Sequence, residues 1–306
     1  PPTMSTRRTG KGKKGTKKPA SVKRRIELLD FHIIPLFGSR RMNDFGEKQE
    51  QALKDRLAGR KSKSTYNCAA ATINKLLQGA KAKKLFSSEA FRFSCFPRGK
   101  TRPRYYTHRQ LELIVKSSKK FGTVAECLVL LGTDAGFRRG EMLGLDGANV
   151  NLDTGRVEIW EAEYIIEARR NADTPKSGVM RAVKMTPRLR EALERRIEEV
   201  GYGRLFVGKD GKQMTNWDMR VLMAGIQEAA GLPDAGNLHV LRHTFGSHLA
   251  LAGVPMLTIQ SLMGHSNIQS TMAYMHLAPS DIEAGIDRLV SAQGQPGGNE
   301  NAPNHQ

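Results

Sequence analysis

The sequence predicts a mainly α fold with a small antiparallel β-sheet, an α+β arrangement in which a helical N-terminal domain precedes a larger second domain. Apolar residues recur at helical spacing through most of the chain. Strand-like alternation is confined to residues 156–185. The 306 residues, of which 39% are hydrophobic, are enough for two domains, or for one large domain with tails.

The composition indicates a polyanionic partner. The net charge is +19, and nucleic acid is the expected source of the opposite charge, with an acidic membrane surface as the weaker alternative. No run of 18 apolar residues exists and the N-terminus lacks an apolar signal core. We therefore expect no membrane association and a cytoplasmic, nucleoid-associated protein. The three widely spaced cysteines are expected to be reduced thiols.

Residues 1–25 are expected to form a disordered basic arm. They contain ten cations and no acid, and apolar residues are scarce. Such a segment cannot bury enough surface to fold alone. We favour an arm that contacts DNA over a solubilising tail. The chain opens with Pro1 rather than Met, so its natural start is expected to be missing.

Residues 26–96 predict a small helical domain that binds DNA. Helices are expected at 25–34, ending at Pro35, at 47–57 and at 64–77, where apolar residues recur one turn apart. The outer positions of the third helix are rich in Lys and Arg, which suits contact with a DNA backbone or groove. The alternative for any single lysine is a solvated helix face.

A linker at 97–104 is expected to join this domain to a second one, at 105–290. The linker has two prolines, one glycine and four cations, which suits a strap across a phosphate backbone. Capping boxes at Thr107 and Thr123 predict the first two helices of the second domain. The helix after Thr123 is apolar nearly all round, so we expect it in the core.

The strands of the second domain are expected at 156–160, 163–167 and 181–185, where alternation is strongest. The stretch 174–178 between the last two predicts a loop. We expect these strands to form one small antiparallel sheet.

Helices and a tail are expected to follow the sheet. The first helix opens at Thr186 and Pro187 and closes at Gly201. Further helices are predicted at 240–252, 256–263, 270–277 and 281–290. Residues 291–306 are rich in Gly, Asn, Gln and Pro, which predicts a disordered tail.

Cations and one hydroxyl in the second domain suggest covalent chemistry on a phosphodiester. Arg138 follows the predicted core helix, where its guanidinium offers a fork for two phosphate oxygens; the alternative is a surface cation at the helix end. His239 and Arg242 share one face of a predicted helix. Tyr274 supplies a hydroxyl that can attack a phosphate. A loop lysine such as Lys176 usually faces solvent.

Metal and nucleotide chemistry find little support. His239 and His243 have the spacing of a zinc-binding pair, but Val240 stands where such sites carry their glutamate, and no third ligand has standard spacing. No paired carboxylates suggest magnesium. No phosphate-binding loop of the G-x-x-x-x-G-K-[ST] type occurs near Gly10. We therefore expect no cofactor and no metal.

These residues together resemble the tyrosine recombinase, or phage integrase, family over about residues 105–290. Gly-Phe-Arg-Arg-Gly-Glu at 136–141 resembles the first arginine box of the family, and the spacing to Glu141 gives the role to Arg138 rather than Arg139. Thr-Pro-Lys-Ser-Gly at 174–178 resembles the β-hairpin lysine box.

The remaining boxes follow in the family order. Leu-His-Val-Leu-Arg-His-Thr at 238–244 resembles the H-x-x-R box, Leu-Met-Gly-His at 262–265 resembles the box of the last histidine, and a tyrosine follows nine residues later. His243, His248 and His276 are expected only to pack or support. The catalytic residues implied by the resemblance are Arg138, Lys176, His239, Arg242, His265 and Tyr274.

The resemblance implies a site-specific recombinase or integrase that cuts and rejoins DNA through a 3′-phosphotyrosyl link, without metal or ATP. The arginines would hold the phosphate, nearby cations would favour the phenolate of Tyr274, His239 would take its proton, and Lys176 would protonate the leaving oxygen. The implied partners are double-stranded DNA, a homotetramer on two DNA sites and accessory DNA-bending proteins. Two alternatives remain: a type IB topoisomerase-like enzyme and a DNA-binding regulator without catalysis.

Overall fold

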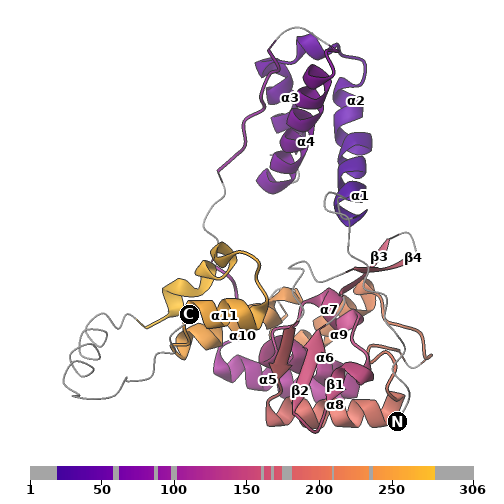
Figure 1. Cartoon of the computed structure of the whole chain (residues 1–306), viewed down its shortest axis with the longest axis vertical. Helices are drawn as coiled ribbons and strands as arrows, with labels where there is room; N and C mark the ends of the chain where they lie inside the picture. Colours follow the sequence, from indigo (N-terminus) through magenta and orange to yellow (C-terminus); the bar gives the residue numbers. More distant parts are fainter. Residues whose placement is uncertain are drawn as a thin grey trace, which may run out of the picture. The chain divides into compact units, whose positions relative to one another are not determined.

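The computed structural model describes residues 19–57, 62–85, 89–97, 102–159, 162–166, 169–173, 181–208, 210–233 and 237–279. The chain divides into two compact units, Pro1–Gly99 and Lys100–Gln306, each of which is described by itself (Figure 1). Helices dominate both, and short antiparallel strands occur in the second. This confirms the expected mainly α fold with a small β component. The prediction of a disordered arm at 1–25 is wrong for residues 19–25, because they lie in helix α1 (Pro19–Leu28), whose Leu28 packs in the core of the first unit. Residues 1–18, the predicted helix at 281–290 and the predicted tail at 291–306 lie outside the described residues.

The first unit is built from four α-helices, a π-helical turn and a 3-10 turn (Met42–Asp44) among its described residues. The α-helices are α1 (Pro19–Leu28), α2 (Ile34–Phe37), α3 (Glu47–Leu57) and α4 (Lys63–Ala82), and the π turn is Leu29–Ile33, between α1 and α2. The expected helices at 47–57 and 64–77 are confirmed, the second with extra residues at both ends.

The predicted helix end at Pro35 is wrong. Pro35 lies in the first turn of α2, and the chain is helical on both sides of it. A proline in a first helical turn lacks an N–H that has little need of a partner there. The preceding π turn already departs from the regular α-helical ladder, so the backbone passes through the proline without a break.

Two asparagine side chains of α4 bind the segment from residue 89 to residue 97. Asn74 accepts from the backbone N–H of Phe93 at 2.8 Å and donates to its carbonyl at 2.9 Å. Asn67 makes the same pair of bonds with Phe96, at 2.8 and 2.9 Å. This segment covers a core that includes Leu53, Tyr66 and Phe93.

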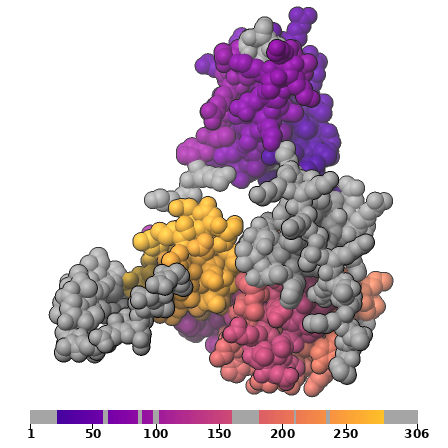
Figure 2. Space-filling model, viewed as in Figure 1, coloured from indigo at the N-terminus to yellow at the C-terminus, as the bar shows by residue number. Residues whose placement is uncertain are grey.

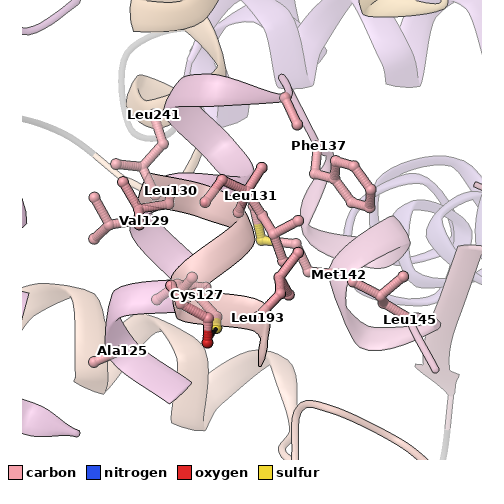
Figure 3. Packing of buried hydrophobic residues seen from close by; sticks show 14 of the residues in the cluster. Ala125, Cys127, Val129, Leu130, Leu131, Phe137, Met142, Leu145, Leu193 and Leu241 are labelled. Atoms are coloured by element: carbon pink, nitrogen blue, oxygen red, sulfur yellow. Dashed lines mark hydrogen bonds between the residues drawn. The ribbon is translucent and has the colours of Figure 1, made fainter. Parts of the chain in front are cut away.

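The second unit is organised around α6, whose residues from Ala125 to Asp134 are all buried. Figure 3 shows side chains of α6 packed with Leu193 of α8 and Leu241 of α10. The predicted core helix is therefore confirmed. The α-helices of this unit are α5 (His108–Ser118), α6 (Thr123–Asp134), α7 (Arg139–Leu143), α8 (Pro187–Val200), α9 (Asn216–Ala229), α10 (His239–Leu251) and α11 (Met256–Met263).

Helix starts agree with the sequence in part. The capping box at Thr107 is present. The one predicted at Thr123 is wrong, because Gly122 is the N-cap residue and the Thr123 hydroxyl donates instead to Glu199 of α8. A carboxylate brought near by tertiary packing has replaced the local cap. The predicted helix at 270–277 is a 3-10 helix, Met272–Leu277, preceded by another at Ile268–Ser270.

The strands form two separate antiparallel groups. The three-stranded sheet has the order β1 (Val150–Asn151), β2 (Arg156–Ile159) and β5 (Arg181–Lys184). The strand β3 (Ala162–Ile166) pairs instead with β4 (Arg169–Asp173). The prediction of a single sheet is therefore wrong. The sequence of β4 is polar and lacks apolar–polar alternation, so it was not predicted as a strand. Because β3 pairs with β4, β3 is not part of the three-stranded sheet.

The C-terminal part of the described chain forms a small core of its own. It joins Phe245 and Ala250 of α10, Ile259 and Met263 of α11, and Tyr274 of the last 3-10 helix. Figure 2 shows this segment, coloured orange to yellow, gathered on one side of the surface of the second unit. None of the helices in the described ranges is long and apolar enough to cross a membrane.

Candidate active site

The turn after α6 places Arg138 at the start of α7. Gly136 makes this turn with φ +64°, a left-handed conformation that favours glycine. A Cβ at Gly136 would also lie 2.5 Å from a ring carbon of Phe245. Glycine is therefore required twice, for the backbone and for the packing of α10. Arg138 then occupies the N-cap position of α7.

Glu141 fixes the Arg138 guanidinium. Its carboxylate accepts from Arg138 Nη1 at 2.7 Å and from the Arg138 backbone N–H at 2.8 Å. Arg181 of β5 donates to the same carboxylate at 3.1 Å, and the Glu141 side chain is fully buried. Burial raises the pKa of Glu141, but Arg181, Arg138 and the backbone N–H outweigh it and hold the pKa below its usual value. Glu141 is thus a buried anion between two cations.

The carbonyl groups at the end of α11 hold two arginines. Arg138 Nη2 donates to the carbonyl of Gly264 at 2.8 Å. Arg242 donates to the carbonyls of Met263 and Gly136, and it is only 4% exposed. Burial, and then the charge of Arg138, lower the pKa of Arg242 to about 9, which leaves it cationic at neutral pH. α6, α10 and α11 thereby bring two guanidinium groups together.

His265 lies beside these arginines as a neutral imidazole. Its Nδ1 is 2.9 Å from the hydroxyl of Thr271, which is buried. Burial lowers the pKa of His265 to about 4, and the charges of Arg242 and Arg138 contribute. A neutral imidazole with one nitrogen engaged keeps its other nitrogen for a ligand.

Tyr274 is buried against α10, with 2% of its surface exposed. Its hydroxyl lies 2.8 Å from Nδ1 of His243. Burial raises the pKa of Tyr274 to about 12, although the charge of Arg242 acts in the opposite direction. Arg242 thus favours the phenolate as expected, but Tyr274 stays protonated in this conformation. The loss of hydration outweighs the attraction of the arginine.

The sequence predicts only a packing or supporting role for His243, but His243 is the imidazole that contacts the tyrosine. His239, one turn earlier and exposed, has its ring 6.0 Å from that of His243. Burial lowers the pKa of His243 to about 4, so it is neutral and can accept a hydrogen bond. His248 is a structural residue, with Nε2 2.8 Å from the carbonyl of Tyr106. His276 is exposed.

The structure brings five of the six expected residues into one region of the second unit; they are Arg138, His239, Arg242, His265 and Tyr274. The sixth, Lys176, lies outside the described residues. The sequence did not indicate that Arg181 would pair with Glu141 at this site. Within the described ranges, no group of three or more His, Cys, Asp or Glu side chains is arranged to hold a metal ion. The cluster can therefore offer an anion two guanidinium groups and a neutral imidazole, with a hydroxyl close by.

Comparison with known proteins bears on this cluster. A sequence profile of the phage integrase family matches residues 104–281. Tyrosine recombinase XerC of Methylobacterium nodulans is 32% identical over 96 residues, 31% of this chain and 30% of the relative. The integrase of Haemophilus phage HP1 is 39% identical over 84 residues, 28% of this chain and 23% of the relative. The chain thus matches less than a third of the length of either relative.

Solved structures share the fold. The integrase of transposon Tn1549, in complex with transposon right-end DNA, superposes with a TM-score of 0.76 at 21% identity, covering 90% of this chain and 95% of that one. A lambda integrase dimer bound to a core site gives a TM-score of 0.67 at 15% identity, covering 85% and 72%. At these identities the likeness shows the fold alone.

Proposed function

Because this chain belongs to the phage integrase family, we propose that it is a site-specific DNA recombinase that works through a covalent bond between Tyr274 and a DNA 3′-phosphate. The observation that carries the proposal is the position of Tyr274. Its hydroxyl contacts His243, and its ring shares a small core with Met263, whose carbonyl holds Arg242. The substrate is double-stranded DNA, which also suits the net charge of +19.

Arg138 and Arg242 bind the non-bridging oxygens of the phosphate in this proposal. Both are oriented before DNA arrives, Arg138 by Glu141 and Gly264 and Arg242 by Gly136 and Met263. Donors fixed in advance stabilise the charge of the transition state without having to reorganise. His265 supplies a further donor. Removing one such donor typically costs ~10²–10³ in rate.

The hydroxyl oxygen of Tyr274 attacks the phosphorus, an O–P bond forms, and the bond to the 5′-oxygen breaks. The tyrosine proton passes to a histidine. His239 is the acceptor that the family resemblance implies, and neutral His243 is the base within hydrogen-bond distance of the resting hydroxyl. Lys176 gives a proton to the departing 5′-oxygen. Attack by a 5′-hydroxyl of another strand reverses these steps, so no ATP is needed to reseal.

The arginines and His265 supply the electrostatic stabilisation, so the proposed mechanism requires no metal. Recombination exchanges strands between two DNA sites, for which we propose a homotetramer and accessory DNA-bending proteins. The protein then acts at the nucleoid, in the cytoplasm.

A plasmid that carries two copies of the recombination site separates this function from its alternatives. We expect the wild type to delete the intervening DNA, and Tyr274→Phe to give no product while still binding the site. A type IB topoisomerase-like enzyme would instead relax supercoiled plasmids that lack the site. A regulator would bind the site and leave the plasmid intact. Either of these outcomes overturns the proposal.

A further inference from the structure

Basic side chains line a pocket beside the candidate active site. Arg139 of α7, Arg220 of α9 and His239 of α10 surround a hollow of about 340 Å³, together with Asn237 and Leu238. Both arginines are solvent-accessible. Three helices therefore contribute basic side chains to one open space.

The two arginines of this pocket have no acidic partner among the residues that the structure describes. Of the carboxylates in those ranges, none forms an ion pair with Arg139 or Arg220. Partial burial lowers the pKa of Arg139, and the like charge of Arg220 lowers it further. Two guanidinium groups that line one pocket repel each other, and a bound anion would relieve the repulsion.

The contrast with the neighbouring Arg138 is informative. Arg138 has its guanidinium engaged by Glu141 and by the carbonyl of Gly264. Arg139, the next residue, has no such carboxylate among the described residues and points to the pocket instead. A planar guanidinium presents parallel donors that match two oxygens of a phosphate. The pocket thus has the chemistry of an anion site in which neither arginine is committed.

The pocket also borders the residues assigned to the reaction. Arg139 is adjacent in sequence to Arg138, and His239 lines the pocket while its ring lies 6.0 Å from that of His243. His243 in turn contacts the Tyr274 hydroxyl. A DNA strand whose cleaved phosphate lies on Arg138 and Arg242 would continue past this position.

Building on the proposed function, we propose that Arg139 and Arg220 bind a second backbone phosphate, one that flanks the phosphate attacked by Tyr274. This contact fixes the position of the strand and takes no part in bond breaking. Arg139 and Arg220 are therefore positioning residues, and their loss acts on DNA binding before it acts on chemistry.

The salt dependence of binding to a short duplex of arbitrary sequence tests the site. Each lost phosphate contact lowers the slope of log K against log salt by about 1. We expect that decrease in R139Q/R220Q, measured by fluorescence anisotropy. R139K/R220K should keep the slope, since the charge remains, but should bind less tightly than the wild type because the planar fork is lost. An unchanged slope in R139Q/R220Q overturns the proposal.

A matched variant controls for net charge. R156Q/R190Q also removes two cations, the exposed Arg156 of β2 and the exposed Arg190 of α8, neither of which forms an ion pair among the described residues. Helix α8 lies below α7 and α9 in the view of Figure 1. We expect a smaller change in slope, and an equal change would overturn the proposal. Circular dichroism checks that each variant is folded. If the double variant does not fold, the single variants R139Q and R220Q replace it, and each should show part of the decrease in slope.

Two further measurements identify the occupant. In a duplex that carries the recombination site, methylphosphonate at the flanking phosphate should weaken wild-type binding and leave R139Q/R220Q unaffected. If inorganic phosphate raises the wild-type Tm through these arginines while the DNA slope is unchanged, free phosphate is the ligand and the proposal fails. The slope does not depend on Tyr274, so a failure to form any covalent adduct would sink the proposed function and leave this site standing.

Discussion

Tyr274 and His243 form a buried pair, with the phenolic oxygen 2.8 Å from the imidazole Nδ1. The pair exists because α10 has a glycine where the tyrosine ring lies. A Cβ at Gly246 would be 2.8 Å from a ring carbon of Tyr274 and 2.8 Å from the sulfur of Met263. In this conformation the proposed nucleophile is protonated and shielded from solvent.

Gly246→Ala should drive Tyr274 out of this position. The added methyl group cannot fit, and overpacking of this kind typically costs about 1–3 kcal/mol of stability. Nitration by tetranitromethane, which requires the phenolate, should then modify Tyr274 readily, whereas the wild-type residue, with a pKa of about 12, should resist. Mass spectrometry of the Tyr274 peptide measures the difference.

Gly225→Ala of α9 is the matched control for that experiment. A Cβ there would meet only the ring of Phe121, at 3.2 Å, and that ring is 41% exposed and can move. Tyr274 should stay protected in this variant. Equal protection of Tyr274 in Gly246→Ala and in the wild type would show that the glycine does not hold the pair together.

Stability should fall as the pH drops, because of two histidines. His243 and His265 have pKa values of about 4 in the folded chain, against about 6.5 when unfolded. The unfolded state therefore binds more protons below pH ~6.5. The free energy of unfolding is highest, as far as these two groups are concerned, above that pH, and it decreases toward pH ~4. For partly exposed groups we expect about 1–2 kcal/mol per histidine between pH ~7.5 and ~5.

Urea unfolding at the two pH values measures this slope. His243→Gln and His265→Gln should each remove part of it, and the double variant more. His276→Gln is the control, since His276 is exposed and should leave the slope unchanged. A double variant with the wild-type slope would contradict the assignment of neutral imidazoles to the site.

Glu141 should contribute strongly to stability, because it pairs with Arg181 as well as with Arg138. Glu141→Gln leaves Arg181, whose side chain is 7% exposed, without its carboxylate. Breaking a buried pair in this way typically costs about 3–5 kcal/mol. Asp210→Asn, which removes a carboxylate from an exposed pair with Lys212, should change little. Equal urea midpoints for these two variants would refute a structural role for Glu141.

Local signals were sufficient for much of the fold. The periods at 47–57 and 256–263 matched their helices to the residue, because amphipathic spacing is retained when the packing surface is simple. The spacing of Arg138 to Glu141 identified Arg138 as the arginine that a carboxylate orients. α9 was missed, although Thr215 and Asp218 form a capping box that marks its start.

The rest depends on contacts that the sequence does not reveal. Spacing places His239 and His243 on one helix face, but only the packing of the last 3-10 helix on Gly246 decides which ring meets Tyr274. Arg181 was predicted as a strand residue, and its pairing with a carboxylate 40 positions earlier is tertiary. The raised pKa of Tyr274 follows from burial, which depends on the assembled core.

Covalent trapping tests most directly whether Tyr274 is the nucleophile. The protein is incubated with a nicked duplex that carries its recombination site, so that the released end diffuses away and the intermediate accumulates. We expect a protease-sensitive protein–DNA adduct with the wild type, and no adduct with Tyr274→Phe, whose affinity for the same duplex is retained. An adduct formed by Tyr274→Phe in undiminished yield would contradict the proposed mechanism.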